Sequence, residues 1–197
     1  SDSAAIERTV AEAPTRTTVA ASANPVTAGT SVTYTIDVTS ATGAPTGTVA
    51  LADGGAAYRS CTLAAVNATT SRCTVSGADL LPGTHPLVAT YASDGNFATS
   101  SSATLAQVIR AITTTTITSS VNPAVYLQTV TFSVTVATSD GTTASGVVTV
   151  RNGVTTIATC SLAAASGTDA TCDVTTASLA VGTRSITAEY AGDAGHA

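Results

Sequence analysis

Four cysteines are the residues of this sequence whose type and spacing point most directly to chemistry. They form two pairs, Cys61 with Cys73 and Cys160 with Cys172, and eleven residues separate the members of each pair. In an exported chain this repeated spacing indicates disulfides, so we expect one bond in each copy, closing a hairpin of neighbouring strands. The rival interpretation is a tetrahedral zinc site, which the lack of a CxxC spacing and the presence of only two histidines disfavour.

The other polar residues do not form the pattern of a catalytic or metal site. His85 corresponds to Arg184 in the repeat described below, which favours an exposed strand position over a catalytic base. Asp94 and Asp193 each follow a tyrosine-containing strand in a turn, where aspartate usually binds backbone N–H groups. No serine lies in a GxSxG sequence. We therefore predict no catalytic residue, no metal site and no cofactor, and we expect that the chain is not an enzyme.

One glycosylation sequon lies between the cysteines of the first pair. Asn67-Ala68-Thr69 fits the N-x-[ST] pattern in a predicted hairpin loop, so Asn67 is a candidate N-glycosylation site. Sequons this short also arise by chance, and the sequence does not decide whether this one is used.

Charge and hydropathy exclude two classes of partner. The seven basic residues are all arginines scattered along the chain, and the net charge is −5, so no basic stripe is available to neutralise phosphates. No stretch approaches the ~20 apolar residues of a membrane-spanning helix. We predict neither nucleic-acid binding nor membrane insertion.

An internal repeat organises the chain. Asn24-Pro25 recurs 98 residues later as Asn122-Pro123, whereas Cys61, Cys73 and Tyr91 recur 99 residues later. A repeat of this length indicates a duplicated domain, and one inserted residue near a turn explains the change of offset.

Each copy has the pattern of a series of short strands. Residues 31–38 alternate apolar and polar side chains, and residues 129–136 repeat the alternation. Period two places Val32, Tyr34 and Ile36 on one face of the first of these strands. Further strands are predicted at 17–19, 47–51 and 87–91, and at 115–117, 146–150 and 185–190. Clusters of Pro, Gly, Asn and Asp separate these runs, so we predict an all-β fold of two tandem immunoglobulin-like β-sandwich domains.

The ordered motifs of the two copies resemble the bacterial Ig-like repeat family. The first copy has Pro45–Val49 and Gly83-Thr84-His85 leading to Tyr91–Phe97, and the second has Gly182-Thr183-Arg184 leading to Tyr190–Asp193. The resemblance runs from about Thr15 onward. It implies an Ig-like fold in arrays on surface or secreted proteins and no particular ligand. The cysteine pairs are not part of the family pattern, and Ser93 stands where glycine is commoner.

The two ends of the chain do not match. The first domain, residues 15–110, closes with a strand near residues 101–109, whereas the second, residues 111–197, is predicted to lack its final strand. Residues 1–14 precede the first domain and resemble that closing strand, because Ser3–Ile6 matches Ser102–Leu105. An open sandwich edge exposes unpaired backbone groups and part of a core, so we expect it to be filled.

Two explanations of this mismatch stay open. In one, the chain is a fragment whose boundaries fall within a domain. In the other, residues 1–14 of one subunit complete the second domain of a neighbouring copy, which is donor-strand complementation in a head-to-tail polymer. The predicted donor-strand residues are Ala4, Ala5, Ile6 and Val10.

The favoured function is a structural subunit of an extracellular filament or surface stalk, with a secreted, extracellular or cell-surface location. The alternative is an adhesion or carbohydrate-binding module of a larger secreted or surface protein, with a glycan or surface receptor as its partner. Sugar sites usually display exposed aromatic rings, and Tyr58 and Tyr126 are the two aromatic residues outside the predicted core pattern.

Overall fold

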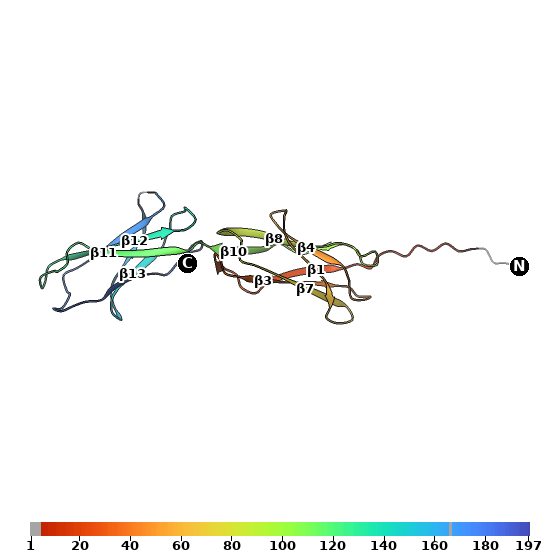
Figure 1. Cartoon of the computed structure of the whole chain (residues 1–197), viewed down its shortest axis with the longest axis horizontal. Coiled ribbons are helices and arrows are strands. Elements are labelled where there is room, and N and C mark those ends of the chain that lie inside the picture. Colours follow the sequence, from red (N-terminus) through yellow and green to blue (C-terminus); the bar gives the residue numbers. More distant parts are fainter. Residues whose placement is uncertain (1–4, 166) are drawn as a thin grey trace. The chain divides into compact units, whose positions relative to one another are not determined.

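The chain folds into β-strands, turns and loops (Figure 1). The structure is a computed structural model that describes residues 5–165 and 167–197. The described residues include no helix long and apolar enough to cross a membrane. They divide into two compact units: residues up to Leu80 with Thr84–Val108, and Leu81–Gly83 with Ile109–Ala197.

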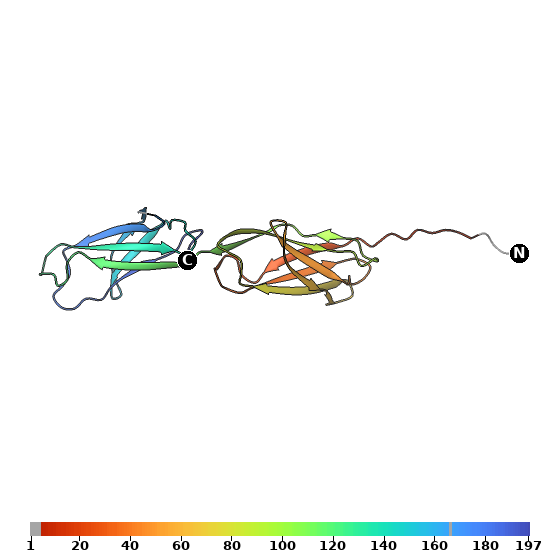
Figure 2. The ribbon, with the colours of Figure 1, turned by 45° about the horizontal axis from the view of Figure 1, so that its top comes forward.

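The first unit packs two sheets against each other (Figure 2). One sheet has the order β1 (Arg16–Ala21), β3 (Val32–Thr39), β7 (Thr70–Gly77) and β6 (Ala64–Ala65). The other has the order β2 (Val26–Thr27), β10 (Leu105–Arg110), β8 (Gly83–Tyr91), β4 (Thr48–Asp53) and β5 (Ala56–Thr62), with β9 (Ser100–Ser101) paired to β8.

The second unit repeats this plan with fewer strands. One sheet has the order β11 (Thr113–Ser119), β12 (Val130–Thr138), β16 (Ala170–Thr176) and β15 (Ala163–Ala164). The other has the order β14 (Thr155–Ser161), β13 (Val147–Asn152) and β17 (Ile186–Tyr190).

Strands in which buried and more exposed side chains alternate supply the core of each unit. The predicted face of β3 is buried and its intervening threonines are half-buried, and β12 places Phe132, Val134 and Val136 in the core of the second unit. Burying side chains of this size contributes about 1.5–3 kcal/mol each, which is what holds two sheets together without tryptophan or methionine. The predicted all-β sandwich fold is therefore confirmed.

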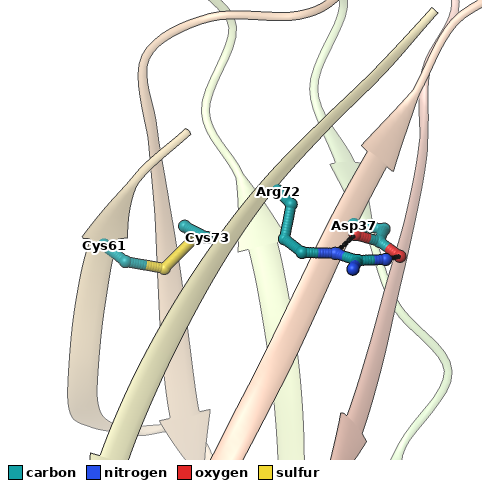
Figure 3. Close-up of a disulfide and its surroundings, with 4 residues drawn as sticks. All are labelled: Asp37, Cys61, Arg72 and Cys73. Carbon is teal, nitrogen blue, oxygen red and sulfur yellow. Dashed lines mark hydrogen bonds and ion pairs between the residues drawn. A yellow bond between two sulfur atoms is a disulfide. The ribbon is translucent and has the colours of Figure 1, made fainter. Parts of the chain in front are cut away.

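Both cysteine pairs are bonded within their own unit, with Cα–Cα distances of 5.9 Å for Cys61–Cys73 and 5.8 Å for Cys160–Cys172. The expectation that each bond closes a hairpin is wrong. Cys61 lies on β5 and Cys73 on β7, which belong to different sheets, so the bond joins the two layers of the sandwich (Figure 3). Arg72, the neighbour of Cys73, points to the opposite face and makes a two-bond pair with Asp37 on β3.

Replacing Cys61 and Cys73 together by alanine is expected to lower the free energy of unfolding of the first unit by about 3 kcal/mol, because the bond restricts the unfolded loop between them. Urea unfolding of the first unit measures the change. The Cys160→Ala and Cys172→Ala pair is the matched variant, since its sequence separation is the same 12 residues. A change within about 0.5 kcal/mol of zero, as for a neutral surface substitution, would contradict the prediction.

Candidate functional site

The second unit leaves one edge of a sheet uncovered. In the first unit, β8 is covered by β10, and β2 lies beyond β10. In the second unit, the counterpart of β8 is β17, and among the described residues β17 pairs only with β13 and forms the edge of its sheet. Residues 124–125, the counterparts of β2, are not a strand. The described chain thus presents an unpaired strand edge beside the core of the second unit.

The side chains of β8 and β17 differ in how deeply they are buried. Leu87, Ala89 and Tyr91 on β8 are 0% exposed. Their counterparts on β17, Ile186, Ala188 and Tyr190, are only partly buried, although they pack against the core. The core of the second unit is therefore open along the sheet edge at which β10 lies in the first unit.

A groove of about 780 Å³ lies at this open face. Its floor is apolar and is formed by Ile117 on β11, Phe132 on β12 and Ile186 on β17, with Leu179 from the loop before β17. Its lining also includes large apolar side chains that are exposed: Val125, Tyr126, Leu127 and Val181. Sequence reasoning did not identify these rim residues, except Tyr126. Aligning the two copies signals two of them, since Thr27 and Gly29 of the first copy are replaced by Val125 and Leu127.

Three of the four predicted donor-strand residues are described, and these three are exposed. Ala5 is exposed, and Ile6 and Val10 are 88% and 91% exposed. Ala4 lies outside the described residues. The described chain first contacts the first unit at Glu12, which accepts a hydrogen bond from Ser93, and at Ala13, which pairs with the segment around Phe97. Ala5, Ile6 and Val10 are thus not part of a core in the described chain, and residues 5–11 form no strand.

The turn after β17 is held by Asp193. Its carboxylate accepts hydrogen bonds from the backbone and hydroxyl groups of Ser145 and from the N–H groups of Gly195 and His196. Burial acts to raise the pKa of Asp193, but these hydrogen bonds, led by those from Ser145, outweigh it and hold the pKa below the usual range. Asp94 occupies the same place in the first unit, where hydrogen bonds led by that from Thr46 lower its pKa. Both carboxylates thus bind backbone N–H groups in turns.

The two histidines have different polar partners in different parts of the chain. His196 is buried, with Nδ1 2.8 Å from Asp193 and Nε2 2.9 Å from the Thr142 hydroxyl. His85 is half-buried, with Nδ1 2.6 Å from Asp53. In residues 5–165 and 167–197, no group of three or more His, Cys, Asp or Glu side chains is arranged to hold a metal ion.

The two tyrosines considered for sugar binding differ in accessibility. Tyr58 is half-buried, its hydroxyl donates to Asp79 at 2.9 Å, and the Arg59 guanidinium lies 4.4 Å from its ring centroid. Burial, and then the hydrogen bond with Asp79, raise the pKa of Tyr58 to about 12. Tyr126 is 64% exposed at the groove rim. Only Tyr126, of these two, offers a free aromatic face.

Asn67 lies in the exposed turn between β6 and β7, as predicted from the loop pattern. Its side-chain oxygen accepts hydrogen bonds from the N–H and hydroxyl groups of Thr69. The sequon is therefore at the surface, and its modification stays a prediction.

Comparisons with known proteins bear on the fold of both units. The family model described as "Bacterial Ig-like domain (group 3)" matches residues 18–110 and 117–197. No curated protein matched the chain. One similar solved structure, of fibronectin(III)-like modules of Clostridium thermocellum CbhA, is 16% identical, with a TM-score of 0.43, and the match covers 90% of this chain and 87% of that one.

Proposed function

Because this chain belongs to the bacterial Ig-like domain (group 3) family, in two tandem copies, we propose that it is a structural subunit of an extracellular filament or surface stalk. Neighbouring copies join by donor-strand complementation, in which the N-terminal segment of one copy fills the groove of the next. The observation that carries this proposal is the uncovered edge of β17 beside an apolar groove.

The chemistry of the groove favours a β-strand as its occupant. An edge strand presents unpaired N–H and C=O groups that bind another extended backbone, and exposed apolar patches of this kind mark binding surfaces. In the first unit the same position holds β10, and this supports a strand as the occupant. The groove therefore fits a strand that carries two apolar side chains four residues apart on one face, as β10 does.

The N-terminal segment meets this requirement. Leu105 and Ile109 lie four residues apart on one face of β10, and Ile6 and Val10 have the same spacing. Ser3–Ile6 also matches Ser102–Leu105 in sequence. Both Ile6 and Val10 are exposed, so their burial in a partner would add about 1.5–3 kcal/mol each.

The geometry of such a contact gives an open polymer. The donor segment and the groove are different surfaces, so each copy can use both at once, and a head-to-tail contact that does not close into a ring propagates. Both disulfides support an oxidising, extracellular or cell-surface location.

Deleting residues 1–11 tests the proposal. This deletion retains Glu12 and Ala13, which contact the first unit. The full chain is expected to form filaments visible by electron microscopy, whereas the shortened chain remains monomeric in sedimentation experiments. Filaments of the shortened chain, or no assembly of the full chain at any concentration tested, would contradict the proposal.

The exposed ring of Tyr126 supports adhesion to a glycan as a second candidate function. A glycan-array signal that disappears in Tyr126→Ala, while filaments still form, would favour this function.

A further inference from the structure

In the first unit, an asparagine side chain binds the main chain of the closing strand. Asn24 Nδ2 donates to the carbonyl of Ala106 at 2.7 Å, and the N–H of Val108 donates to Asn24 Oδ1 at 2.9 Å. One amide thus satisfies a carbonyl and an N–H of β10 on either side of Gln107, in the way that a neighbouring strand would.

The second unit presents the same side chain to its groove. Asn122 is the counterpart of Asn24, precedes a proline in the same way and lines the groove. Within the described residues, no hydrogen bond involves its side-chain amide. In the first unit this asparagine binds β10. In the described part of the second unit the asparagine is present, but no strand lies at the place of β10.

We propose that Asn122 binds the main chain of the incoming segment and fixes its register. This inference rests on the proposed function. Asn122 Nδ2 donates to the carbonyl of Glu7 of a second copy, and the N–H of Thr9 donates to Asn122 Oδ1. In this register Ile6 and Val10 take the places of Leu105 and Ile109. The two hydrogen bonds of Asn122 and the burial of both apolar side chains therefore require the same register.

The register places Arg8 where the first unit has Gln107. Gln107 is fully buried, and its Nε2 lies 3.3–3.4 Å from three acceptors, the carbonyls of Ala23 and Val108 and the side-chain oxygen of Asn24. Its own Oε1 has no partner. The position thus accepts hydrogen-bond donors, and arginine carries donors only. The charged end of Arg8 can also extend along the apolar rim towards water.

The test uses the full chain carrying Ile6→Asp and Val10→Asp, so that its own N-terminal segment does not compete. The probe is a fluorescent peptide of residues 3–12. Adding Asn122→Ala is expected to weaken peptide binding by about 10- to 100-fold, through the loss of two hydrogen bonds. Asn122→Asp, which keeps one acceptor but sets a carboxylate oxygen against the carbonyl of Glu7, should weaken binding at least as much.

Stability without the peptide separates a binding role from a structural one. Asn122→Ala should leave the thermal midpoint of the peptide-free chain unchanged, because its amide has no partner there. Asn24→Ala is the matched control: it should lower the stability of the first unit and leave peptide binding unchanged.

A peptide with Arg8→Gln should bind within a few-fold of the original, whereas Arg8→Glu should lose binding, since it places acceptors against acceptors.

The outcomes distinguish this inference from the proposed function. If the peptide does not bind the chain that retains Asn122, the donor-strand proposal fails. If it binds equally well to the Asn122→Ala chain, or if Asn122→Ala lowers stability without peptide, the inference about Asn122 is overturned and the donor-strand proposal stands.

Discussion

Appending a copy of residues 99–110 directly after Ala197 is expected to stabilise the second unit and to abolish assembly. His196 and Ala197 are the counterparts of Phe97 and Ala98, because Ala111 pairs with His196 as Ala13 pairs with Phe97. The appended residues would continue from Ala197 as residues 99–110 continue from Ala98, and would supply β17 with the strand that β10 supplies to β8.

The expected gain follows from the side chains that the new strand buries. The copies of Leu105 and Ile109 would contribute about 1.5–3 kcal/mol each, so we expect about 3–6 kcal/mol as an upper limit. Ile186, Ala188 and Tyr190 would become as buried as Leu87, Ala89 and Tyr91. Calorimetry measures the thermal midpoint of the second unit, and sedimentation measures assembly.

The matched control is the same extension with Leu105→Asp and Ile109→Asp in the appended copy. It adds the same length of chain without the apolar anchors, so it should neither stabilise the unit nor block assembly. Filaments formed by the chain with the unaltered extension would show that this groove is not the site of assembly.

Replacing Ile6 and Val10 together by aspartate is expected to abolish filament formation while both units keep their thermal stability. Both side chains are exposed in the single chain, so the folded units lose no contact. In the assembled state the substitution removes two buried anchors, about 3–6 kcal/mol together, which weakens the junction by roughly 100- to 10,000-fold. Sedimentation equilibrium over a range of concentrations measures the effect.

The opposite face of the same segment provides the control. Glu7→Gln with Thr9→Ser changes the side chains that alternate with the anchors and point away from the groove in the proposed register. This variant should assemble within a few-fold of the original chain. Equal loss of assembly in both variants would mean that the two faces of the segment are not distinguished, and the predicted anchors would be wrong.

Local patterns sufficed to predict several parts of this fold. Alternation over residues 31–38 identified β3 and its buried face, because side chains of a strand point to opposite sides whatever sheet it joins. The repeat of Cys61 and Cys73 at Cys160 and Cys172 identified the bonded pairs, since duplicated domains keep the same neighbours. The likeness of Ser3–Ile6 to Ser102–Leu105 predicts a donor segment, and this stays a prediction.

Other features depend on which strands meet, and only the tertiary structure determines that. Alternation assigns a residue to a face but not to a partner strand, so β5 and β7 looked like one hairpin although they lie in different sheets. The burial of His196 and Gln107 arises from contacts far apart in sequence, with Thr142 and with Asn24. Asn24 and Asn122 both precede a proline, but the hydrogen bonds of Asn24 join it to Ala106 and Val108, far along the chain, so only the tertiary structure reveals that this asparagine binds the closing strand.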